Sequence, residues 1–368
     1  MVIGSTPGGL RERSAGRLQR MWAERGGLSH AFLPLAWLFG GVTAARRWIY
    51  QRGIATTHAL PVPVVVVGNL LVGGAGKTPA VIAITALLRA HGWSPGIVSR
   101  GFGRERENEI LEVNAGTEAR RAGDEPLLLT RRSGAPVFVG ADRVAAGHAL
   151  LQAHPEVDVI VSDDGLQHLG LGRDVEVVVF DERGVGNGRM LPAGPLREPM
   201  PESGSGSATN PKRIVLYNAA APTTPLPGFP SRRALARLVP LADWWRGDTA
   251  SADVLEQLRM RPVVAAAGVA RPRRFFDMLR EAGLTINELP LADHFDFAVL
   301  PWPIGTSDVV ITEKDAVKLV PERRIGARVW VAALDFEPGP GFAEALLSRL
   351  PLRPLAQPPH EPHGNTPA

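Results

Sequence analysis

The sequence predicts an α/β fold with a mostly parallel sheet, and three observations support this prediction. Mostly aliphatic runs of strand length recur along the chain, at residues 64–68, 157–162 and 175–181. The stretches between such runs have the length and composition of helices, and alternating strands and helices are typical of a parallel sheet. The chain has 368 residues, of which 45% are hydrophobic, so it can bury one large core or two smaller ones.

Residues 64–78, VVVVGNLLVGGAGKT, are the stretch around which the rest of the chain is organised. The four valines predict a buried strand, and the glycine-rich turn after them leads into a helical pattern at residues 79–92. Glycine permits backbone angles at which successive N–H groups surround phosphate oxygens at the positive end of a helix. We therefore expect a nucleotide's phosphates to contact Gly73, Gly74, Ala75, Gly76, Lys77 and Thr78.

Within this loop, Lys77 is expected to neutralise the β- and γ-phosphates, and Thr78 to offer its hydroxyl to Mg²⁺. The strict pattern G-x-x-x-x-G-K-[ST] has glycine at the position of Leu71, so the match is partial. The alternative is an ordinary glycine-rich turn that carries a surface lysine. We define residues 71–78 as the phosphate-binding loop.

Composition narrows the possible partners. The chain has no cysteine, which excludes disulfides, thiolate metal sites and cysteine nucleophiles. Its net charge of +4 suits phosphate-bearing partners or an anionic membrane surface. No nucleic-acid-binding motif is present and the arginines are not interleaved with aromatic residues, so we expect no nucleic-acid partner.

Residues 28–45 contain no charged side chain, and Arg46 and Arg47 follow directly. Trp37 and Trp48 lie where interfacial aromatic residues would anchor a helix at a membrane surface. Crossing the hydrocarbon needs about 20 apolar residues, which is more than this stretch offers. We favour a shallowly inserted, monotopic helix facing the cytosol; a full span and an ordinary core helix are the alternatives.

Three later segments end or begin with charged side chains that suit a ligand site. The strand predicted at residues 96–98 delivers Arg100 to the sheet edge where α/β proteins bind ligands, although a lone arginine there is often only solvated. Asp124 opens a predicted helix, where capping is the simpler explanation. The strand at residues 157–165 ends in Asp163 and Asp164, which fit the Mg²⁺-binding acids of nucleotide-binding enzymes; alone, Asp-Asp-Gly is a common turn.

The second half of the chain repeats the strand–helix alternation after a flexible connector, SGSGSATNPK, in residues 201–212. The Gly- and Pro-rich loop at residues 186–198 before it is expected to carry function. We predict a basic, amphipathic membrane-associated segment, a phosphate-binding-loop domain, a smaller α/β domain and a disordered tail. Their boundaries are residues 1–55, 56–205, 206–350 and 351–368.

Taken together, these segments resemble the tetraacyldisaccharide 4′-kinase family, the lipid A 4′-kinases of Gram-negative bacteria. The likeness extends over residues 30–320, in the family's order, and the family also lacks the first glycine of the strict loop pattern. The motifs that carry it are LPLAWLFGG, RRWIYQRG, VVVVGNLLVGGAGKTP, SRGFG, GDEPLLL, DDGLQH, GNGRMLPAGPLREP, ADHFDF and TEKDAVK.

This resemblance implies a P-loop NTPase-like, mostly parallel sheet with a second, smaller α/β domain and an N-terminal membrane-associated helix. It implies transfer of the γ-phosphoryl group of ATP, with Mg²⁺, to the 4′-hydroxyl of a tetraacyldisaccharide 1-phosphate, which gives lipid IVA. The lipid disaccharide and the cytoplasmic face of the inner membrane are the implied partners. No obligate protein partner is implied.

The resemblance also assigns roles by motif. Asp124 of GDEP and His294 of ADHF match the family's catalytic pair, with Asp124 accepting the hydroxyl proton. The matching metal-site residues are Thr78, Asp163, Asp164 and Glu198. The matching nucleotide-site residues outside the loop are Arg100, Gln167, His168 and Arg197. Phe102 replaces the usual tyrosine, and Arg271 replaces a common asparagine.

Two other classes of protein remain as alternatives. A partitioning- or maturation-type ATPase would carry a signature lysine before the loop glycines, where this chain has Val72. A membrane-attached nucleotide switch would use Asp124 and His294 only structurally. The kinase interpretation requires these two side chains to lie within hydrogen-bonding reach of each other.

Overall fold

A computed structural model describes residue 18 and residues 20–200, 212–248, 253–320 and 325–351. Nearly all of the predicted disordered tail and of the predicted connector lie outside these residues. So does most of the basic stretch that precedes residue 20.

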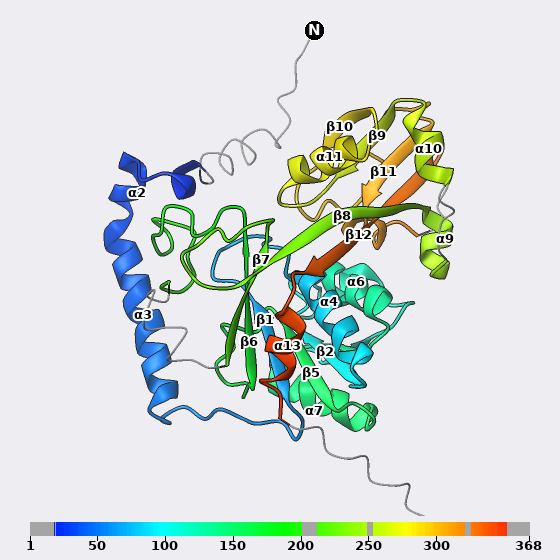
Figure 1. The fold of residues 1–368 in the computed structure, drawn as a ribbon. Coiled ribbons are helices and arrows are strands. Elements are labelled where there is room, and N and C mark those ends of the chain that lie inside the picture. The colour runs from blue at the N-terminus through cyan, green and yellow to red at the C-terminus, as the bar shows by residue number, and fades with distance from the viewer. Residues whose placement is uncertain (1–17, 19, 201–211, 249–252, 321–324, 352–368) are drawn as a thin grey trace, which may run out of the picture.

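Twelve strands in the described part of the chain form one sheet, in the order β10-β9-β11-β12-β8-β7-β6-β1-β5-β2-β4-β3 (Figure 1). They are β1 (Val64–Gly68), β2 (Pro95–Ser99), β3 (Leu111–Val113), β4 (Val137–Val139), β5 (Val159–Asp163), β6 (Val175–Asp181), β7 (Arg213–Asn218), β8 (Phe229–Pro240), β9 (Val263–Ala267), β10 (Ile286–Pro290), β11 (Asp308–Thr312) and β12 (Arg328–Pro338). Neighbours are parallel except in the pairs β3–β4 and β8–β12. The predicted α/β fold with a mostly parallel sheet is therefore confirmed.

Most of the helices lie between strands in sequence, as the alternation predicted, whereas the first two described helices precede β1 and the last one follows β12. They are α2 (Gly27–Ala31), α3 (Leu33–Gln51), α4 (Lys77–Ala90), α5 (Ala119–Ala122), α6 (Asp124–Ser133), α7 (Arg143–Ala153), α9 (Leu241–Arg246), α10 (Asp253–Arg259), α11 (Pro272–Glu281), α12 (Glu313–Ala316) and α13 (Phe342–Leu347). Helix α4 starts two residues before the predicted pattern, because Gly76 is its N-cap and Lys77 already has helical geometry.

Strand β1 lies inside the first half of the sheet, which we define as β1–β7. All five of its residues are buried, and it pairs in parallel with β5 and β6. Side chains covered on both faces explain the unbroken valine run, since a strand with one solvated face would alternate. The carboxyl ends of β1, β5 and β2 consequently lie side by side.

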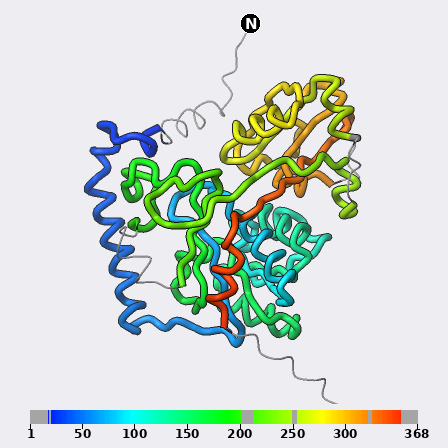
Figure 2. Tube along the Cα trace, viewed as in Figure 1, coloured from blue at the N-terminus to red at the C-terminus, as the bar shows by residue number. Residues whose placement is uncertain are grey.

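Strands β8 to β12 form the second half of the sheet. The long antiparallel pair β8–β12 joins this half to the first, because β8 also pairs with β7. Figure 2 shows the chain passing between the two halves along these strands. A single cluster of buried side chains runs through both halves, with Val65 and Ile84 in the first and Val309 and Ile311 in the second. Strand β7 comes after the predicted domain boundary at residues 205–206, yet it pairs with β6, which comes before that boundary. The division into domains stays a prediction.

Helix α3 lies along one side of the first half of the sheet, on the side away from β9, β10 and β11 (Figure 1). Ala36 is its one buried residue, while Trp37 and Leu38 are 71% and 66% exposed. The alternative of an ordinary core helix is therefore wrong. In the described residues, α3 included, no helix combines the length and the apolar character needed to traverse a bilayer.

Candidate active site

A cavity of about 1180 Å³ lies where the two halves of the sheet and α3 meet. It is lined from the first half by the phosphate-binding loop and the ends of β2 and β5, and from the second half by residues near α11 and α12. Every residue that the sequence placed in the site lines this cavity except Ala75, a loop residue that is 1% exposed. The structure thus brings together segments that are far apart in sequence.

The phosphate-binding loop has the backbone geometry that its glycines predicted. Gly73 and Gly76 have φ angles of 92° and 87°, in the left-handed region that side-chain-bearing residues avoid. A Cβ at Gly76 would lie 2.0 Å from Nδ2 of Asn218, so this position also lacks room for a side chain. The loop ends at the N-terminus of α4, whose positive dipole end faces the cavity and suits phosphate.

Lys77 is already restrained at the cavity wall. Its Nζ donates to Oδ1 of Asn69 over 3.2 Å and lies 3.6 Å from Oδ1 of Asp164. This hydrogen bond to Asn69 restricts the conformations of the Lys77 side chain, so less conformational freedom is lost when the ammonium group binds an anion.

Asp163, at the end of β5, is almost completely buried. Its Oδ2 accepts a hydrogen bond from Oγ of Ser99 over 2.9 Å, while its buried Oδ1 has no hydrogen-bond partner among the described residues. Burial, reinforced by the negative charges of Glu125 and Asp164, raises the pKa of Asp163 to about 7. An acid with an unpaired buried oxygen fits a cation, which would favour its ionised form.

The other predicted metal-site acids have protein partners. Asp164, with φ of 48°, accepts from Nη1 of Arg197 over 3.2 Å. Burial alone would raise the pKa of Asp164, but the positive charges of Lys77 and Arg197 outweigh this effect and lower it. Glu198 forms an ion pair with Arg47 of α3 and accepts from Nε2 of Gln167 over 3.2 Å. Within the described chain no three acidic or histidine side chains form a ready-made metal cluster.

Asp124 and His294 meet across the two halves of the sheet. Asp124 is the first residue of α6, and its Oδ2 lies 3.0 Å from Nδ1 of His294. His294 has φ of 61°, and its backbone N–H donates to the carbonyl of Gly268 after β9. The hydrogen bond that the kinase interpretation requires is therefore present.

Lys318, in the turn after α12, faces the same carboxylate. Its Nζ lies 3.2 Å from Oδ2 of Asp124 and 3.4 Å from Oδ1 of Asp315. Although burial opposes ionisation, His294 and Lys318 lower the pKa of Asp124. Asp124 is consequently a carboxylate at neutral pH and can accept a proton. Glu125, Asp293 and Lys314 are further charged groups beside the pair.

The remaining residues discussed at the sequence level, His168, Arg100 and Phe102, differ in their burial and surroundings. Burial, with the positive charge of Arg143, lowers the pKa of His168 to about 4, so its imidazole is neutral at neutral pH. The side chain of Arg100 is half exposed and lies 4.0 Å from Glu107. The ring of Phe102 is 6.5 Å from that of His294, at the open side of the cavity.

Sequence reasoning gave no role to several residues that the structure places at the site. Lys318 belongs to the TEKDAVK motif, so a signal for it was present. Arg47 was noted only as a flanking cation, yet it reaches Glu198. Nothing local in the sequence indicates that Arg183 and Asn218, at the ends of β6 and β7, contact the phosphate-binding loop.

Comparisons with known proteins agree with this geometry. Residues 28–351 match a family model described as tetraacyldisaccharide-1-P 4′-kinase. A tetraacyldisaccharide 4′-kinase from Leptothrix cholodnii is 54% identical over 94% of this chain and 99% of its own. One from Methylibium petroleiphilum is 55% identical over 92% of this chain and 94% of its own. A crystal structure of LpxK from Aquifex aeolicus in complex with ATP is similar with a TM-score of 0.71 and 25% identity, covering 88% of this chain and 99% of that one.

Proposed function

The chain belongs to the tetraacyldisaccharide-1-P 4′-kinase family, and on that premise we propose how its cavity carries out the reaction. The protein is an ATP-dependent kinase of lipid A biosynthesis. It transfers the γ-phosphoryl group of ATP to the 4′-hydroxyl of a tetraacyldisaccharide 1-phosphate. The observation that carries the proposal is that the Asp124–His294 pair faces the phosphate-binding loop within one cavity.

The nucleotide end of the cavity comprises the phosphate-binding loop with Asp163 and Asp164. In this proposal the loop N–H groups and Lys77 bind the triphosphate of ATP. Asp163, with its unpaired oxygen, and Thr78 are the first candidates to hold Mg²⁺, with Asp164 and Glu198 beside them. Bound Mg²⁺ would neutralise charge on the phosphate oxygens.

The acceptor end comprises Asp124, His294 and Lys318. Asp124 accepts the proton of the 4′-hydroxyl as that oxygen bonds to the γ-phosphorus, and the bond from this phosphorus to the β–γ bridging oxygen breaks to release ADP. His294 orients the carboxylate and shares the proton. Lys318 keeps the carboxylate ionised before the proton arrives.

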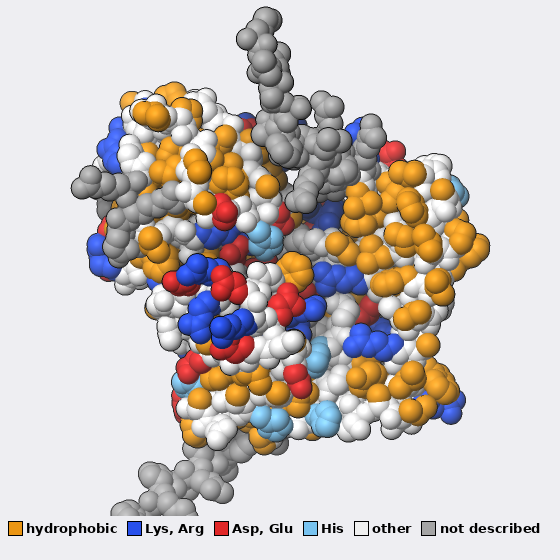
Figure 3. All heavy atoms as spheres, turned by 180° about the vertical axis from the view of Figure 1, so that it is seen from behind, with side chains coloured by type: hydrophobic (Ala, Val, Ile, Leu, Met, Phe, Trp, Pro, Cys, Tyr) orange, Lys and Arg blue, Asp and Glu red, His pale blue; other side chains and the backbone are white. Residues whose placement is uncertain are grey.

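The lipid substrate explains the exposed apolar side of α3. Phe39, Val42 and Thr43 of this helix line the cavity, whereas Trp37 and Leu38 point outward. Seen from behind in Figure 3, apolar side chains cover much of the side of the molecule where α3 lies. We place this face on the cytoplasmic surface of the inner membrane, so that acyl chains stay in the bilayer while the sugar reaches the cavity.

The activity is tested by incubating the purified full-length chain with γ-labelled ATP, Mg²⁺ and the lipid disaccharide in detergent micelles. We expect label in the lipid fraction, dependent on all three components. Label released only as free phosphate would instead indicate an ATPase, and nucleotide binding without turnover would indicate a switch.

The membrane proposal has its own test, which is flotation with vesicles containing anionic lipid. Leu38→Glu should lower the bound fraction, because a charge would enter the apolar interface. Met260→Glu is the matched control, since Met260 is also exposed, at 86%, but lies far along the chain from α3, after α10. Equal binding by both variants and the wild type would contradict the proposed surface.

A further inference from the structure

We propose that Arg183 is a positioning residue that presets the phosphate-binding loop for a triphosphate, together with Asn69 and Asn218. This inference rests on the proposed ATP binding. It goes beyond the loop motif itself, since all three residues act from outside the loop, on its carbonyl groups.

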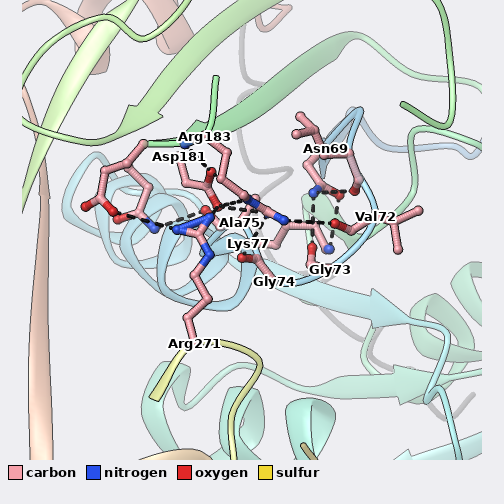
Figure 4. A network of polar contacts seen from close by, with 12 residues as sticks. Asn69, Val72, Gly73, Gly74, Ala75, Lys77, Asp181, Arg183 and Arg271 are labelled. Atoms are coloured by element: carbon pink, nitrogen blue, oxygen red, sulfur yellow. Dashed lines mark hydrogen bonds and ion pairs between the residues drawn. The ribbon is translucent and has the colours of Figure 1, made fainter. Parts of the chain in front are cut away.

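Five consecutive carbonyl groups of the loop accept hydrogen bonds from these three side chains. Nδ2 of Asn69 donates to the carbonyls of Leu71 and Gly73, over 2.7 and 3.3 Å. Nη1 and Nη2 of Arg183 donate to those of Val72 and Gly74, over 3.1 and 3.4 Å. Nδ2 of Asn218 donates to that of Ala75 over 3.0 Å. Figure 4 shows Arg183 and Asn69 reaching the loop from separate directions.

Fixing these carbonyls also fixes the N–H groups. In a planar trans peptide the C=O of one residue and the N–H of the next point in opposite directions. Holding the carbonyls of residues 72–75 in place therefore also fixes the directions of the N–H groups of residues 73–76. Those N–H groups are the ones expected to surround phosphate oxygens.

Arg183 is itself held firmly. Asp181, at the end of β6 and 1% exposed, accepts from Nε and Nη2 of Arg183 over 3.1 and 2.9 Å and also pairs with Arg271 of the second half. A guanidinium group has enough donors in one plane to hold the carboxylate and two carbonyls together. A lysine at this position has a single nitrogen, so it cannot reproduce the arrangement.

The test is calorimetric titration of the full-length protein with Mg·ATP, alongside kinetics with the lipid disaccharide. Arg183→Gln should raise the Kd and the KM for ATP about tenfold, the effect of losing roughly two ordinary hydrogen bonds. The KM for the lipid should stay within about twofold, as expected for a site without direct lipid contact. A merely structural defect would not separate the two substrates in this way.

Two controls sharpen the test. Arg213 also pairs with a carboxylate through two guanidinium nitrogens, that of Glu176, but at the end of β6 and β7 opposite to the phosphate-binding loop. Arg213→Gln should therefore leave the Kd for ATP within about twofold. Arg183→Lys keeps the charge and should still bind ATP about fivefold more weakly than the wild type.

The inference is overturned if Arg183→Gln binds ATP as the wild type does, or if Arg183→Lys restores full affinity. Should Arg183→Gln lose its cooperative thermal transition, Asn218→Ala tests the same claim from β7 and should raise the Kd about threefold. A wild-type protein that binds no ATP would instead refute the proposed function, and this inference with it.

Discussion

The phosphate-binding loop is one continuous stretch of the sequence, whereas the acceptor end of the cavity is assembled from distant segments. Lys77 and its asparagine partner are eight positions apart, but Asp124 and His294 are separated by 170. The first arrangement depends on local backbone geometry. The second depends on how the two halves of the sheet pack against each other.

Ion pairs between α6 and the α12 region hold the acceptor end together. Lys318 pairs with Asp124, and Lys314 with Glu125. Farther along α6, Arg132 pairs with Glu313, which also accepts from Nε1 of Trp244 over 3.2 Å. These contacts align Asp124 with His294, the proposed catalytic pair. Substitutions at the two ends should consequently fail in different ways.

Lys77→Ala should produce the largest loss, because it removes the charge that meets the triphosphate in both the bound and the reacting state. We expect kcat/KM for ATP to fall about 10³-fold, measured by label transfer to the lipid. Lys212→Ala is the control and should keep full activity, because this lysine directly precedes β7 and lies outside the cavity. A similar loss in both variants would point to a general defect.

Asp124→Asn should lower kcat about 10²-fold, since the amide has nearly the shape of the carboxylate but cannot accept the proton. The KM for ATP should stay unchanged, in contrast to Lys77→Ala. Steady-state kinetics with each substrate varied separately measure this difference. An unchanged kcat would mean that Asp124 is not the proton acceptor.

Lys318→Met should change the pH dependence more than the maximal rate. The Lys318 charge lowers the pKa of Asp124, so its removal raises that pKa. More of the carboxyl group is then protonated at acid pH and cannot serve as a base. The acid limb of the kcat/KM profile should move to higher pH, and Lys318→Arg should largely restore it. A uniform loss at every pH would contradict this role.

Glu313→Gln should have the smallest effect on activity but a measurable effect on the fold. It leaves Arg132 without its charged partner at the contact between the two halves. The free energy of unfolding in urea should fall by about 2 kcal/mol, whereas the exposed Glu337→Gln should stay within about 0.5 kcal/mol. Equal stability of the two variants would mean that this ion pair does not hold the halves together.

The same comparison explains what could be predicted from the sequence. The phosphate-binding loop was predictable because its glycines, Lys77 and Thr78 are contiguous. The Asp124–His294 pair was identified only through the family resemblance, because no local pattern says that residues 170 apart will meet. The long antiparallel pair β8–β12 was not predicted, since pairing between strands distant in sequence leaves no local signal. Arg183 was missed for the same reason.

Product analysis tests the central claim most directly. Phosphorus NMR and mass spectrometry of the lipid formed by the wild-type chain from Mg·ATP and the tetraacyldisaccharide 1-phosphate would identify the new bond. We predict one added phosphomonoester, on the 4′-oxygen, with one ADP formed for each. ATP consumption with no new phosphomonoester on the lipid would contradict the account.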